Sequence, residues 1–203
     1  MRRQPLGRIV KKYIFIITER VKKVKKFELT NEFITNMFGT KLFRIRALVE
    51  FGDVEAGELG GYVEKESNLG HDDNAWVYGD AQVSGDALVY DNAWVYGDAQ
   101  VSGDARVCGN ARVYGDARVC GNGDYAYAHG FGSVNRTTTF FRLKDGGVGV
   151  RCGCFYGTLA QFRDKIRETH GESAIAEEYL DLAALMEKRF RRTGNEQKTE
   201  EES

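Results

Sequence analysis

The sequence predicts a mainly β protein, built around a three-sided parallel β-helix and followed by an α+β cap. Two observations support this fold class. Residues Asn74–Ala87, which read NAWVYGDAQVSGDA, recur unchanged as Asn92–Ala105, eighteen positions later. A shorter repeat of six residues runs inside the long one, so three short units make one long repeat. Self-similarity at a fixed period is typical of a solenoid, here with three sides to a coil.

The six-residue repeat consists of a valine, an alanine two positions before it, and a Gly-Asp or Gly-Asn pair. An α-helix cannot keep this period on one face, because six residues advance it by about 600°. The A-x-V alternation instead predicts a short strand with both small apolar side chains inward, and the pair after it predicts a corner. The repeated residues are Ala75, Ala81, Ala87, Ala93, Ala99, Ala105, Ala111 and Ala117 with Val77, Val83, Val89, Val95, Val101, Val107, Val113 and Val119.

This pattern resembles the hexapeptide-repeat family, whose signature is an aliphatic residue followed four positions later by a small one. Val77-Tyr78-Gly79-Asp80-Ala81-Gln82 fits that signature, and the strict match covers residues 74–124. The resemblance implies a left-handed parallel β-helix and frequent assembly into trimers. It also implies an enzymatic alternative, because many members transfer acyl groups from coenzyme A.

Composition narrows the classes of partner. The net charge of −1 over 203 residues gives no argument for nucleic acid or a membrane. Residues 1–26, however, carry ten Lys or Arg against the single acid Glu19. We interpret this segment as a basic N-terminal extension, which is either a poorly ordered or helical extension without a partner or an arm that binds an anionic partner. It is the one place where nucleic acid would be expected to bind.

The sequence predicts a cytoplasmic location. The apolar run Tyr13–Ile17 is shorter than the core of a secretory signal, and no stretch reaches the length of a membrane span. Four cysteines in such a chain indicate a reducing compartment.

Residues 27–58 are predicted to be a β-rich lead-in, because Phe43–Val49 alternates apolar and basic residues as a half-buried strand does. The β-helix is expected over residues 59–128, with about 3.5 coils. Its frame slips once, since Leu69 should be followed by a small residue at position 73 but the next alanine in phase is Ala75. Two extra residues should therefore bulge out at a corner within Gly70–Asn74.

Residues 129–192 are predicted to be the cap that a short solenoid needs at its end. Thr137–Leu143 and Val148–Phe155 should form a hairpin around a Gly-Gly turn. Thr158 and Gln161 form a capping box that opens a helix ending at Gly171, and a second helix is expected over Ser173–Arg191. Residues 193–203 are polar and are expected to form a disordered tail.

The segments flanking the repeats, GGYVEKESNL at 60–69 and CGCFYGTL at 152–159, also resemble hexapeptide-repeat proteins encoded by phages and prophages of gut bacteria. This resemblance implies a phage protein acting in the host cytoplasm. It assigns no activity.

One side of the predicted coil is aromatic. Residues eighteen apart stack in columns, and outward positions on this side hold rings that a monomer does not normally expose. We expect the side to be covered, either by the chain's own cap, by a neighbouring copy in a homo-oligomer, or by a foreign partner or small anionic ligand. The predicted partner-binding residues are Trp76, Tyr78, Trp94, Tyr96, Arg112 and Tyr114.

Catalytic candidates are few. Under the acyltransferase alternative, with acetyl-coenzyme A as cofactor, His71 in the bulge or His129 beyond the last coil would act as the general base. Cys152 and Cys154 would project from one side of a strand as half of a metal site, but no set of ligands completes it, so no metal is expected. The corner aspartates, such as Asp80 and Asp98, have a structural reason, because Asp and Asn suit left-handed backbone. The sequence therefore predicts a non-catalytic binding protein that uses no cofactor and binds a host protein or a small signalling ligand, for example in counter-defence.

Overall fold

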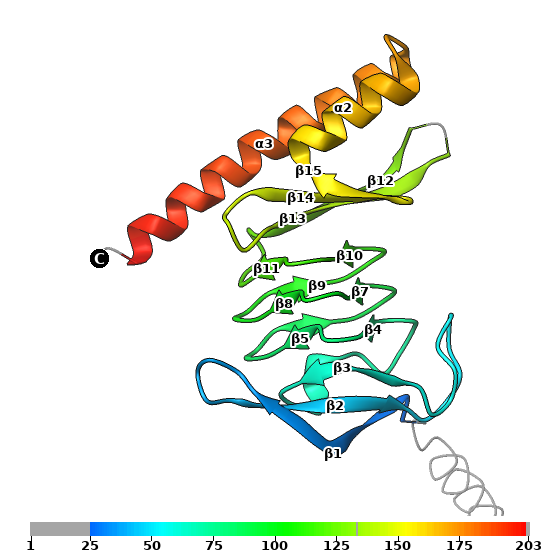
Figure 1. The fold of residues 1–203 in the computed structure, drawn as a ribbon, viewed down its shortest axis with the longest axis vertical. Coiled ribbons are helices and arrows are strands. Elements are labelled where there is room, and N and C mark those ends of the chain that lie inside the picture. Colours follow the sequence, from blue (N-terminus) through cyan, green and yellow to red (C-terminus); the bar gives the residue numbers. More distant parts are fainter. Residues whose placement is uncertain (1–24, 133, 202–203) are drawn as a thin grey trace, which may run out of the picture.

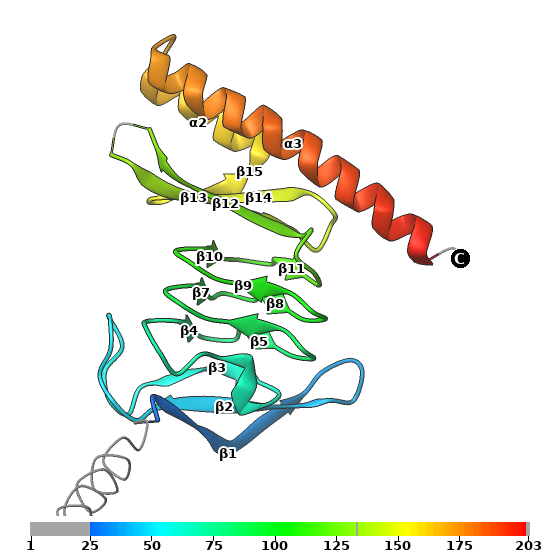
Figure 2. The ribbon, with the colours of Figure 1, turned by 180° about the vertical axis from the view of Figure 1, so that it is seen from behind.

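The computed structural model of the chain describes residues 25–132 and 134–201. They form an elongated stack with a β-hairpin lead-in at one end, a solenoid in the middle and an α+β cap at the other end (Figure 1), as the view from behind also shows (Figure 2). Residues 1–24 of the predicted basic extension lie outside the described residues.

The solenoid is a three-sided parallel β-solenoid, as predicted. One side stacks β3, β5, β8 and β11, a second stacks β4, β7 and β10, and a third stacks β6 and β9. Leu69 extends the third side by a parallel bridge to Val89. The chain thus makes three complete coils and one side of a fourth. The strands are β3 (Leu59–Val63), β4 (Trp76–Val77), β5 (Gln82–Val83), β6 (Leu88–Val89), β7 (Trp94–Val95), β8 (Gln100–Val101), β9 (Arg106–Val107), β10 (Arg112–Val113) and β11 (Arg118–Val119).

The register confirms the position of the two extra residues. Tyr62 lies opposite Gln82, twenty positions later, whereas Trp76 lies opposite Trp94 with the regular spacing of eighteen. The additional residues therefore fall between these two strands. At the corner between them Asp73 has φ +57°, a left-handed conformation that Asp tolerates better than most residues.

The inward alanines and valines form one continuous core. All eight Ala–Val pairs are buried, with at most 1 % of each side chain exposed. The corners between them require left-handed backbone, which Gly97 supplies with φ +74°. Asp91 adopts φ +57° at a corner that lacks glycine. This supports a structural role for Asp91, whereas before Asp80 and Asp98 the left-handed residue is the glycine.

The lead-in is a hairpin of β1 (Phe27–Thr35) and β2 (Lys41–Ala47), and β2 pairs antiparallel with β3. It therefore continues one side of the solenoid into a six-stranded sheet. The strand expected over Phe43–Val49 is present, but it starts two residues earlier and ends at Ala47. Between β3 and β4 the short 3₁₀ helix η1 (Glu66–Asn68) forms part of the first coil.

The cap contains more sheet than the sequence predicted. The expected hairpin is formed by β13 (Arg136–Arg142) and β14 (Val148–Cys152), and β12 (Tyr125–Phe131) and β15 (Phe155–Thr158) flank it in one antiparallel sheet. Helices α2 (Leu159–His170) and α3 (Ala174–Glu201) cover the sheet face that points away from the solenoid (Figure 1).

Both helices begin close to their predicted starts. Thr158 caps α2, with its hydroxyl accepting from the Gln161 N–H and the Gln161 side chain accepting from the Thr158 N–H, so the capping box is confirmed. Helix α3 continues to Glu201, whereas the sequence predicted a disordered tail from residue 193. Among the described residues, no helix combines the length and apolar character that a membrane crossing needs.

Side-chain contacts close the lower end of the solenoid. The Ala75 carbonyl has no coil below it, and it accepts a hydrogen bond of 2.8 Å from Lys26 Nζ. The buried Lys26 ammonium also lies 4.8 Å from the centre of the Phe51 ring. In η1 the backbone N–H of Asn68 donates to the Lys65 carbonyl and so does not reach the next coil. The side-chain amide of Asn68 takes its place and donates to the Ala87 carbonyl at 2.8 Å.

Side-chain oxygens close the upper end. Asn122 Oδ1 accepts from the Arg106 N–H at 2.9 Å, Thr139 Oγ1 accepts from the Arg112 N–H at 3.0 Å, and Asp124 Oδ2 accepts from the Cys120 N–H at 3.0 Å. These N–H groups would otherwise pair with a further coil. A backbone N–H group that the cap buries without a hydrogen-bond acceptor would lower the stability of the fold.

Asp124 also connects the last coil to the cap. Its buried carboxylate, only 2 % exposed, accepts from Arg142 Nε at 2.9 Å, and Arg142 donates through Nη2 to the Phe190 carbonyl at the end of the cap core. We expect Asp124→Ala to lower the free energy of unfolding by about 3–5 kcal/mol, because it leaves a half-buried guanidinium without its carboxylate. Urea denaturation followed by circular dichroism measures this. Asp104→Ala, at an exposed corner, is the control and should stay within about 0.5 kcal/mol of wild type.

Burial lowers the pKa of Lys26 from 10.5 to about 8, with Asp73 and Asp72 opposing the shift. Between pH 8 and 10.5 the unfolded chain therefore binds more protons at this site than the folded chain. The contribution of Lys26 to the free energy of unfolding should accordingly rise with pH across this window. The melting temperature of wild type relative to Lys26→Met should therefore rise between pH 8 and pH 10.5 and stay level below pH 8, while loss of the hydrogen bond to the Ala75 carbonyl offsets the variant by an amount that does not change with pH. Lys25→Met, whose side chain is 60 % exposed, is the control, and parallel wild-type and Lys26→Met profiles would contradict the assignment.

Candidate binding surface

The structure brings five of the six predicted partner-binding residues together on the side formed by β4, β7 and β10. Tyr78, Trp94, Tyr96 and Tyr114 are half-buried, and Arg112 is exposed. We call these residues, with Tyr156 of β15, the aromatic wall. Tyr156 was not predicted, because it comes from the cap and lies outside the repeat.

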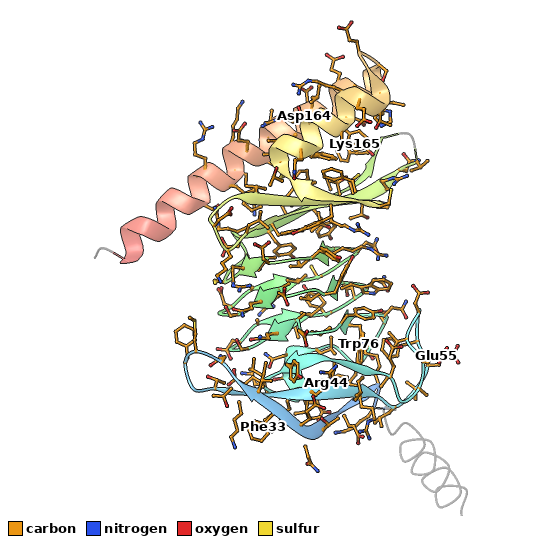
Figure 3. All side chains as sticks on the ribbon, viewed as in Figure 1. Phe33, Arg44, Glu55, Trp76, Asp164 and Lys165 are labelled. Carbon is orange, nitrogen blue, oxygen red and sulfur yellow. The ribbon has the colours of Figure 1, made fainter. Side chains whose placement is uncertain are left out.

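The prediction that Trp76 is part of an exposed column is wrong. Its side chain is fully buried at the base of the solenoid, where it is labelled in Figure 3. The rings of Phe51 and Phe27 contact it edge-on, at 5.3 Å and 6.1 Å between centroids. The lead-in folds back over this coil, and Gly60 allows close approach because a Cβ there would lie 2.7 Å from the Trp76 ring. An outward position in the repeat is therefore exposed only where no other segment of the chain packs against that side of the coil.

The rings of the aromatic wall contact one another in an edge-to-face series. Centroid distances are 5.3 Å from Tyr78 to Trp94, 6.1 Å from Tyr78 to Tyr96, and 4.6 Å from Tyr96 to Tyr114. Tyr156 continues the series at 4.6 Å from Tyr114. Edge-to-face pairs of this kind are favourable, so the wall is held in place before any partner binds.

Basic side chains lie on the wall. The Arg112 guanidinium is 4.0 Å from the centre of the Trp94 ring, which occupies the same column one coil earlier. Arg151 of the cap lies 5.6 Å from the centre of the Tyr114 ring. The Trp94 indole is also fixed by its N–H, which donates to the Asn74 carbonyl at 3.1 Å.

The hydroxyls of Tyr78 and Tyr156 stay protonated at neutral pH. Burial, reinforced by Glu58 and Asp53, raises the pKa of Tyr78 to about 12. Burial also raises the pKa of Tyr156, with help from Asp116, whose carboxylate lies 3.5 Å from the hydroxyl. The wall therefore presents neutral rings and hydroxyl donors beside two guanidinium groups.

The two catalytic candidates lie at opposite ends of the solenoid. His71 Nδ1 accepts from the Lys26 backbone N–H at 3.2 Å, and Nε2 lies 2.9 Å from Glu66 Oε1. Its ring also stacks on Phe27 at 4.4 Å, so Nδ1 and the ring face hold the lead-in while Nε2 pairs with Glu66 of η1. A neutral His71 in this arrangement has no free lone pair for a general base. His129 on β12 is exposed, and its Nδ1 lies 2.8 Å from Thr137 Oγ1.

The cysteine pair does not lie in one strand. Cys152 is the last residue of β14 and is buried, and Gly153 turns the chain with φ +59°, so that Cys154 is exposed. The expectation that both thiols project from one side of a strand is wrong for this reason. Within residues 25–132 and 134–201, no three His, Cys, Asp or Glu side chains gather closely enough to hold a metal ion.

A family model described as a YdcK beta solenoid repeat matches residues 81–97, 99–111 and 105–121. These segments run from β5 to β11, so the comparison supports a β-solenoid repeat protein over the regular coils. It leaves out the lead-in, the cap and the first coil. No curated protein gives a significant match to the chain.

The chain has two tryptophans, and their surroundings differ. In Trp94→Phe the remaining Trp76 should emit at short wavelength and resist quenching by acrylamide, because it is fully buried. In Trp76→Phe the remaining Trp94 should emit at longer wavelength and be quenched several-fold more strongly. Equal quenching of the two variants would contradict the placement of the lead-in over Trp76.

Proposed function

We propose that this protein is a non-catalytic interaction protein and that the aromatic wall is the surface through which it binds another protein. One observation carries the proposal: a series of partly exposed rings, flanked by Arg112 and Arg151, crosses three coils and the cap without interruption. Tyrosine, tryptophan and arginine are the residue types enriched at the centres of protein interfaces.

The rigidity of the wall favours binding. Trp94 lies on β7 and Tyr156 on β15, and each of the other three tyrosines directly follows a solenoid strand, so the backbone and the ring-to-ring contacts restrict the rotamers of the rings. Less side-chain entropy is then lost on association than with flexible residues. Burying these rings would contribute roughly 25 cal/mol for each Å² of apolar area, before association costs are subtracted.

The partner that we favour is a second copy of the chain, in a trimer, as the resemblance to hexapeptide-repeat proteins implies. The resemblance of the flanking segments to phage and prophage proteins supports the second partner, a host protein in the host cytoplasm. The acyltransferase alternative gains no support from His71, since both of its ring nitrogens are engaged.

The double variant Trp94→Ser with Tyr96→Ser tests the proposal. It removes the middle of the wall and leaves the inward Ala–Val pairs intact, so the solenoid should still form. If copies associate through the wall, light scattering should show the dissociation constant rising at least about a hundredfold, because central aromatic residues each contribute about 2 kcal/mol or more.

The matched control is Gln82→Ser with Gln100→Ser, which changes outward residues of the same coil and of the next one on the side formed by β5 and β8. If the wall binds a host protein, the oligomeric state should survive in the wall variant while capture of that protein from host lysate is lost. A wall variant that keeps both its oligomeric state and its captured partners would overturn the proposal.

A further inference from the structure

The cap contains a pocket that the aromatic wall does not use. It has a volume of about 320 Å³ and lies between the cap sheet and helices α2 and α3. Phe155, Phe162, Ile166 and Tyr179 are among its lining residues, and Figure 3 shows α2, which carries the labelled Lys165, on top of this sheet. Its volume falls at the lower end of the range for small-ligand sites, roughly 300–1,000 Å³.

The pocket is apolar at its base. Phe162 contacts Phe155 at 5.4 Å and Tyr179 at 5.9 Å between ring centroids, so these rings pack against one another and still leave an open volume beside them. The pocket opens to the surface and its exposed lining is mostly apolar, which suits the apolar part of a small ligand.

The lining is basic and contains no acid. Arg136 lines the pocket, and the structure gives its guanidinium no hydrogen bond or ion pair with any described residue. It lies directly over Gly153, where a Cβ would collide with Nη1. Lys165 also lines the pocket, but it pairs with Glu168 at 3.0 Å. Arg136 is thus the cation that remains available to a ligand.

We propose that this pocket binds a small carboxylate with an apolar body, such as a medium-chain fatty acid. The apolar body occupies the space beside Phe155, Phe162 and Ile166, and the carboxylate pairs with Arg136. A guanidinium binds a carboxylate through two parallel hydrogen bonds, and such charge-assisted bonds are stronger than neutral ones. This site is independent of the aromatic wall and of the proposed interaction function.

Calorimetric titration with octanoate and with octanol tests the proposal, because the two probes share an apolar body and differ in the charged head. The intact protein should bind octanoate at least about tenfold more tightly than octanol, since a hydrogen bond between two charged groups is stronger than a neutral one. Arg136→Met should remove this preference and leave octanol binding unchanged, which also shows that the variant is folded. Arg191→Met, at an exposed position of α3, should behave as wild type.

Thiol labelling with N-ethylmaleimide locates the bound probe. Cys154 is exposed and lines the pocket, whereas Cys120 is exposed on the solenoid and serves as an internal control. Saturating octanoate should slow labelling of Cys154 several-fold and leave Cys120 unchanged. Equal binding of octanoate and octanol to the intact protein, or labelling of both thiols at unchanged rates with octanoate bound, would overturn the proposal.

Discussion

Pairing of backbone groups between successive coils is the constraint on which this molecule depends. Each outward residue of a coil directs its N–H to a carbonyl one coil further on, as Trp94 does to Ala111 at 2.9 Å. A stack of coils therefore ends with unpaired carbonyls at one end and unpaired N–H groups at the other, and these must find partners when they are buried. Lys26 supplies a donor at the lower end, and Asn122, Asp124 and Thr139 supply acceptors at the upper end.

The two closures determine which part of the aromatic side can meet a partner. At the lower end, the lead-in that brings Lys26 to Ala75 also places Phe27 and Phe51 on Trp76 and removes it from the surface. At the upper end, the cap sheet adds Tyr156 to the column that begins with Tyr78. The exposed aromatic wall therefore begins one position later than the repeat predicts and extends beyond the last coil onto the cap.

The cap has a core of its own, in which α2 and α3 pack against the outer face of the cap sheet. Arg142 links this core to the solenoid through Asp124, while Arg136 lines the pocket and forms no hydrogen bond or ion pair with a side chain in the described part of the chain. Two arginines of the same strand, β13, thus differ in role because one faces a buried carboxylate and the other does not. The pocket and the aromatic wall are separate surfaces, so occupancy of one need not compete with the other.

The repeat was enough to predict the coils, their corners, the inward Ala–Val stack and the position of the extra residues. It also placed Trp94, Arg112 and the three tyrosines on one side, because residues eighteen apart stack in register when one coil follows another. Only the tertiary structure decided that Trp76 is buried, that Tyr156 joins the wall and that His71 is held between Lys26 and Glu66. These contacts join residues outside the repeat to its two ends. The eighteen-residue repeat determines how each coil packs on the next, but it carries no information about the segments that pack on the first and the last coil.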